Sequence, residues 1–113
     1  MSQITTHVLD TSRGKPAMGI RIELFEQKNK QWYSLSSGIT NVDGRVSGLL
    51  SDDRVLNAGT YRMNFNTGDY FDSNNEKGFY PYVDIVFELT GGGSHYHIPL
   101  LLSAFGYSTY RGS

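Results

Sequence analysis

The sequence predicts an all-β domain built as a sandwich of short strands, and three observations support that prediction. Apolar and polar residues alternate with a period of two in several runs, as in Val83, Ile85, Phe87 and Leu89. Residues typical of turns separate these runs, which recur at short and even spacing. The chain has 113 residues, a length that suits one hydrophobic core, so we expect a single domain over residues 1–113.

The alternating runs place eight strands along the chain. Ile4 and Val8 mark the inner face of the first strand, and the later runs have the same pattern. The intervening turns are expected at Gly14-Lys15-Pro16, Asn29-Lys30, Asp43-Gly44, Asn57-Ala58-Gly59 and Gly91-Gly92-Gly93. The strands are expected at residues 3–10, 19–27, 31–39, 45–50, 59–66, 82–90, 94–103 and 106–112.

One segment, residues 66–74, lacks the alternation. Asn66 and Thr67 are candidate N-cap residues, and an acidic residue, Asp69, would lie in the first turn. We therefore expect a short helix here.

The strand at residues 94–103 has two unlike faces. Tyr96, Ile98, Leu100 and Leu102 would face the core, which leaves His95, His97, Pro99 and Leu101 on the other side. Pro99 lacks a backbone N–H and therefore predicts a sheet edge or a bulge. Paired histidines beside an exposed leucine indicate a subunit interface.

Composition excludes several classes of protein. Lys and Arg total 10 against 11 for Asp and Glu, so the net charge is near zero, which argues against general nucleic-acid affinity and is compatible with a defined oligomer. No cysteine is present, which excludes disulfides, thiolate catalysis and cysteine metal sites. The longest apolar run is too short to span a membrane. The strand pattern begins at once, without a signal peptide, so we expect a cytoplasmic protein.

The three histidines, His7, His95 and His97, are the candidates for acid–base chemistry because imidazole titrates near neutral pH. Surface or interface histidines without a role remain the alternative. The His95-x-His97 pair could also chelate a metal, but a catalytic zinc needs a third ligand, and none lies nearby in the sequence. Arg45 is either a solvated charge or an anchor for anionic oxygens. The residues alone name no reaction.

Five blocks of the sequence resemble one enzyme family, the 5-hydroxyisourate hydrolases, which are transthyretin-like. The blocks are residues 4–17, 40–45, 79–81, 95–101 and 106–113. The tail Tyr110-Arg111-Gly112-Ser113 is specific when it occurs with the histidine blocks, because transthyretin shares the sandwich but lacks these polar residues. The resemblance implies two four-stranded sheets, a short helix after the fifth strand, and a homotetramer with active sites in a channel between dimers.

The resemblance also implies the reaction and its residues. Water would open the ring of 5-hydroxyisourate at a C–N bond, without metal or cofactor, to give 2-oxo-4-hydroxy-4-carboxy-5-ureidoimidazoline. Either His7 or His97 would be the base, and Arg45 would hold the substrate oxygens. The implied catalytic residues are His7, Arg45, His97 and Ser113, and the implied substrate-binding residues are His7, Arg45, Tyr110 and Arg111. Of the pair on strand 94–103, the resemblance selects His97 rather than His95.

Two other functions stay open. Transthyretin uses the same architecture to carry a hydrophobic hormone in its central channel, and a structural or adhesion sandwich would need no site at all. A hormone channel would have small and apolar lining groups, whereas His7, Arg45, His97 and Arg111 make this one polar.

Overall fold

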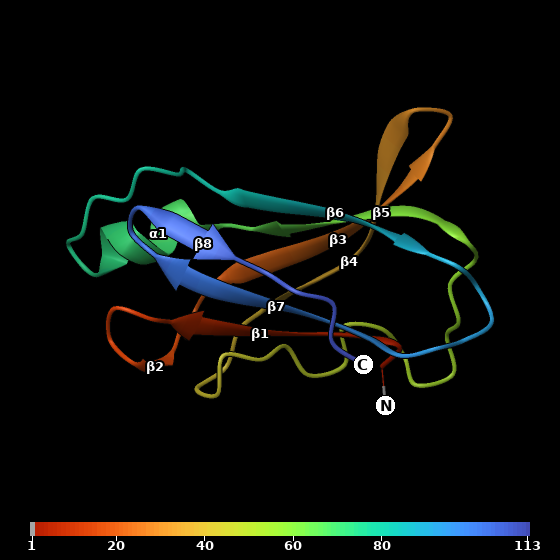
Figure 1. Cartoon of the computed structure of the whole chain (residues 1–113), viewed down its shortest axis with the longest axis horizontal. Coiled ribbons are helices and arrows are strands. Elements are labelled where there is room, and N and C mark those ends of the chain that lie inside the picture. Colours follow the sequence, from red (N-terminus) through yellow and green to blue (C-terminus); the bar gives the residue numbers. More distant parts are fainter. Residues whose placement is uncertain (1) are drawn as a thin grey trace.

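The computed structural model describes residues 2–113, and they form two sheets packed face to face with one helix at the end (Figure 1). The order of elements is β1 (Ile4–Asp10), β2 (Lys15–Pro16), β3 (Arg21–Lys28), β4 (Gln31–Ile39), β5 (Gly59–Phe65), α1 (Thr67–Ser73), β6 (Val83–Leu89), β7 (Tyr96–Ser103) and β8 (Gly106–Ser108). One sheet has the strand order β2-β1-β7-β8 and the other β4-β3-β5-β6. The predicted all-β sandwich of two four-stranded sheets with one short helix is confirmed.

The core lies between the sheets and is made by the predicted inward faces. Tyr96, Ile98, Leu100 and Leu102 of β7 are all buried, and they pack in one cluster with the apolar residues of β1, β3 and β5. On β6 only the two ends, Val83 and Leu89, are fully buried. β6 is the outer strand of its sheet, so the middle of its inward face is only partly covered.

The prediction of a strand at residues 45–50 is wrong. Only Arg45 pairs there, in an isolated bridge to His7. Leu49 and Leu50 are consecutive and both buried, which a strand facing one core cannot achieve, and Gly48 has a φ of 63°. The eighth strand is instead β2, which the sequence predicted to be a turn. Its two residues pair with the end of β1.

β7 and β8 differ from the prediction in two ways that are connected. β8 ends at Ser108 rather than at residue 112, and β7 is an inner strand without a bulge, so the edge or bulge expected from Pro99 is absent. Pro99 can lie inside the sheet because β8 has already ended beside it. Its carbonyl accepts a hydrogen bond from the Thr109 hydroxyl at 2.6 Å, and backbone pairing resumes only at Gly112.

Helix α1 confirms the prediction at residues 66–74, and its buried face anchors it to the sandwich. Asn66 occupies the N-cap position without capping the helix, since its amide donates instead to the Asp69 carboxylate at 2.8 Å. The buried Tyr70 hydroxyl donates to Asp10 at the end of β1, at 2.7 Å. Burial, followed by this bond, raises the pKa of Tyr70 to about 12. Within residues 2–113, no helix is long and apolar enough to cross a membrane.

Candidate active site

The site is built on the pairing of β1 with β7, which run parallel and side by side (Figure 1). Thr5 lies opposite His97 in the register, and His7 lies opposite Pro99. Residues that face each other across paired strands point to the same side of the sheet. Thr5, His7 and His97 are half-buried, whereas their neighbours Ile4 and Val8 are fully buried, so all three side chains point away from the core.

A tight turn places Arg45 beside His7. The Asn41 side-chain oxygen accepts hydrogen bonds from the backbone N–H groups of Asp43 and Arg45, at 2.9 and 3.2 Å. Gly44 has a φ of 74°, and a Cβ at this position would lie 2.5 Å from a carbonyl oxygen of β1. Glycine is therefore required for the turn to approach β1. The carbonyl of Gly44 accepts a hydrogen bond from the N–H of Val8 at 2.9 Å.

The C-terminal tail is attached to β7 at the same place. The N–H of Gly112 donates to the carbonyl of His97 at 2.8 Å, and the N–H of His97 donates back to Gly112 at 3.0 Å. A Cβ at Gly112 would lie 2.9 Å from the Cβ of His97. The close approach that glycine permits places Ser113 beside the His97 imidazole.

The strands β1 and β7, the turn with Arg45 and the tail form an open pocket of about 320 Å³. Its lining residues are Thr5, Arg45, His95, His97 and Ser113. His7 is outside the lining but is bridged to Arg45 and contributes to the electrostatic field at His97. The structure thus brings together His7, Arg45, His97 and Ser113, the four residues predicted to be catalytic. They come from β1, a loop, β7 and the tail.

The electrostatics of this pocket favour a neutral imidazole. Burial lowers the pKa of His97 from its usual range, and the charges of Arg45, then His7 and His95, lower it further. A neutral imidazole has a lone pair that can accept a proton. Arg45 provides a fixed positive charge beside it. Such an arrangement can take a proton from water and stabilise negative charge that develops on a substrate oxygen.

Tyr110 and Arg111, the other predicted substrate-binding residues, lie elsewhere in the single chain. The Arg111 guanidinium lies over the Tyr96 ring, 4.5 Å from its centre. Both tail residues line a separate pocket between β6 and β7, with Ile85 and Phe87 among its walls. Neither residue lines the pocket of His97, and its position over the core-facing Tyr96 places Arg111 on the other side of the sheet from the His97 imidazole.

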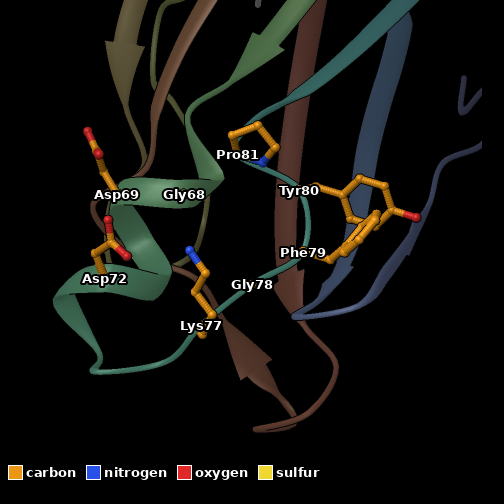
Figure 2. A pocket seen from close by; sticks show the side chains of 8 residues that line it. All are labelled: Gly68, Asp69, Asp72, Lys77, Gly78, Phe79, Tyr80 and Pro81. Atoms are coloured by element: carbon orange, nitrogen blue, oxygen red, sulfur yellow. The ribbon is translucent and has the colours of Figure 1, made fainter.

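Another pocket lies between α1 and the segment that follows it (Figure 2). Asp69, Asp72 and Lys77 line it on one side, and Phe79 and Tyr80 on the other. It contains none of the predicted site residues. Among residues 2–113, no group of three or more histidine, cysteine, aspartate or glutamate side chains is placed to hold a metal ion.

Sequence reasoning missed one residue of the pocket, Thr5. Its hydroxyl lies 3.0 Å from Nε2 of His95 and 2.9 Å from Nδ1 of His97. The two imidazoles are thus joined through a hydroxyl. The signal was the position of Thr5 on the same strand face as His7, but it becomes informative only when β1 is known to pair with β7.

Known proteins resemble this chain over nearly its whole length. The family model described as the HIUase/Transthyretin family matches residues 4–112. The 5-hydroxyisourate hydrolase of Mus musculus is 45% identical over 114 residues, which cover 99% of this chain and 96% of that protein.

Two solved structures extend the comparison. The 5-hydroxyisourate hydrolase of Klebsiella pneumoniae has a TM-score of 0.84 and 34% identity, covering 97% of this chain and 98% of that chain. Sea bream transthyretin, solved in complex with thyroxine, has a TM-score of 0.92 and 26% identity, covering 98% and 95%. On these matches, the chain belongs to the HIUase/Transthyretin family.

Proposed function

We propose that this protein is a 5-hydroxyisourate hydrolase, which opens the ring of its substrate with water to give 2-oxo-4-hydroxy-4-carboxy-5-ureidoimidazoline. The observation that carries the proposal is the pocket in which a histidine of lowered pKa, His97, lies with Arg45 and Ser113. The full-length similarity to hydrolases of this name supports it.

The reaction needs one base, one proton donor and one positive charge. A water molecule gives a proton to the imidazole of His97 or His7 while its oxygen forms a bond to a ring carbonyl carbon. Arg45 stabilises the oxyanion, and removing one such donor typically costs about 2.7–4 kcal/mol of barrier. The intermediate then breaks its C–N bond, and an imidazole returns the proton to the leaving nitrogen. No metal or cofactor takes part in the proposed steps.

The proposal includes assembly as a homotetramer with the sites in a channel between dimers. The pocket opens on the outer face of the β2-β1-β7-β8 sheet, and Leu9 and Leu101 lie half-buried on that face. Tyr110 and Arg111 keep a proposed role in binding substrate, which requires the tail to rearrange or a neighbouring chain to supply them. A cytoplasmic location is also part of the proposal.

Carriage of a small apolar ligand is the second candidate, because the fold matches a transthyretin solved with thyroxine. The pocket that contains His97 and Ser113 argues against it. Its five lining residues are threonine, arginine, serine and two histidines, which are polar, whereas pockets for drug-sized ligands are lined mainly by apolar groups.

The test is the ultraviolet absorbance of 5-hydroxyisourate, generated freshly from urate by urate oxidase. We expect the protein to accelerate its decay, with or without a chelator. His97→Asn and Arg45→Met should each abolish most of the acceleration, and the matched control Arg21→Met, on the exposed side of β3, should retain it. Decay at the spontaneous rate with the wild-type protein would refute the proposal.

A further inference from the structure

The hydroxyl of Thr5 is placed to control which nitrogen of His97 carries the proton. It lies 2.9 Å from His97 Nδ1 and 3.0 Å from His95 Nε2, and these are the two contacts that this hydroxyl makes among residues 2–113. The geometry is set by the backbone, because Thr5 and His97 face each other in the β1–β7 register. Threonine is also stiff about its first side-chain torsion, which helps to fix the hydroxyl.

Counting protons restricts the possible states. A threonine hydroxyl has one proton to donate and lone pairs to accept with, and a neutral imidazole has one N–H and one bare nitrogen. Thr5 therefore cannot donate to both rings at once. If its proton goes to His95 Nε2, then His97 Nδ1 must carry a proton and donate it to the threonine oxygen.

That state leaves Nε2 of His97 bare. The structure gives the His97 ring no other hydrogen-bond partner among the described residues, and the ring lines the open pocket beside Arg45 and Ser113. A bare Nε2 is what a general base needs. The opposite state, with the Thr5 proton on His97 Nδ1, would place the ring proton on Nε2 and remove the basic lone pair.

We propose that Thr5 is a positioning residue that holds His97 in the Nδ1–H tautomer, with His95 accepting the proton of the Thr5 hydroxyl. This inference rests on the proposed function, because it assigns the base of that reaction to His97. In this arrangement His95 acts on His97 through the Thr5 hydroxyl and not through the substrate. His95 directs the Thr5 proton away from His97.

The first test reads the tautomer directly and needs no substrate. Long-range ¹H–¹⁵N correlation spectra distinguish the two nitrogens of each imidazole. We expect wild-type His97 to be the Nδ1–H tautomer. Thr5→Val, which has the same shape but no hydroxyl, and His95→Leu, which has no acceptor, should both shift His97 toward Nε2–H. An Nε2–H tautomer in the wild type, or no shift in either variant, would overturn the inference.

The second test is kinetic. Thr5→Val should lower kcat about 10- to 100-fold, the range that loss of a partner orienting a metal-bound histidine typically gives, and should change KM much less. Thr5→Ser keeps the hydroxyl and should recover most of this loss. The matched control is Thr11→Val, which removes a hydroxyl bonded to the carbonyl of Leu102 at the other end of the same strand pair and should leave kcat unchanged.

The two tests separate failure of the inference from failure of the proposed function. A wild-type protein without hydrolase activity would refute the function, while the spectra would still report the tautomer. An active wild type whose Thr5→Val variant keeps full kcat would refute the inference alone. Circular dichroism of each variant establishes that a loss of rate is not a loss of fold.

Discussion

Replacing Gly112 by alanine tests whether the tail and His97 form one site. The added Cβ would lie 2.9 Å from the Cβ of His97, closer than Cβ atoms come in proteins, and 3.1 Å from its Cδ2, which is also a tight contact. Either the tail detaches or the imidazole moves. In both cases the distance between Ser113 and His97 changes.

The size of the effect follows from the same contacts. Two backbone hydrogen bonds join Gly112 to His97, and each is worth about 0.5–1.5 kcal/mol. The free energy of unfolding should therefore fall by at most about 3 kcal/mol, since the tail can detach while the sandwich stays folded. A displacement of about 1 Å at a catalytic group costs about 100-fold in rate, so kcat/KM should fall by that factor.

The assay combines urea unfolding with the decay of 5-hydroxyisourate absorbance. Gly106→Ala is the matched control, because a Cβ there would meet nothing closer than the Ser103 hydroxyl at 3.8 Å. It should keep both stability and rate. Wild-type kcat/KM in Gly112→Ala would refute the reasoning, because it would mean that the contact between tail and imidazole is irrelevant to turnover.

Four further predictions concern His97, Tyr70 and Gly44. Because burial and then Arg45 lower the pKa of His97, activity should persist below the ordinary imidazole value of about 6.5 and fall as pH drops through the lowered pKa; Arg45→Met should raise that pKa in an NMR titration, and an unchanged value would contradict this. Tyr70→Phe should cost about 1.5–3 kcal/mol in urea unfolding, because the Asp10 carboxylate, 1% exposed, loses a donor at 2.7 Å. The raised pKa of Tyr70 stabilises the fold fully below pH 10, and that contribution should vanish as pH rises to about 12. Gly44→Ala should lower both stability and rate, because φ is 74° and its Cβ would lie 2.5 Å from a β1 carbonyl oxygen; full activity would contradict the assigned turn.

The sequence predicts most of the fold because its strands bury one face each. Period-two alternation finds β1, β3, β5 and β7 to within a few residues, and loss of alternation finds α1. It fails at residues 45–50, where Leu49 and Leu50 are both buried by a loop. It fails at β2 because a two-residue strand leaves no periodic signal. Both features depend on what lies beside them in space.

The candidate site was predictable only in part, for a similar reason. Three histidines and a polar tail are visible in the sequence, but selecting His97 over His95 required the family resemblance. The bond between Thr5 and His97 joins residues 92 positions apart, and no local pattern reports a pairing between distant strands. The structure brings Ser113 to the pocket of His97, whereas Tyr110 and Arg111 line a different pocket.

The parallel pairing of β1 with β7 also sets when this protein can finish folding. β1 is complete once Asp10 has been made, but its inner neighbour in the sheet begins only at Tyr96. At typical synthesis rates of about 5–20 residues per second, the edge of β1 that later receives β7 waits roughly 5–20 s for its partner. An unpaired strand edge in a growing chain is a template for association with other chains. Rapid expression raises the number of growing chains that carry this unpaired edge at one time. It should therefore favour aggregation of nascent chains over completion of the β1–β7 pairing.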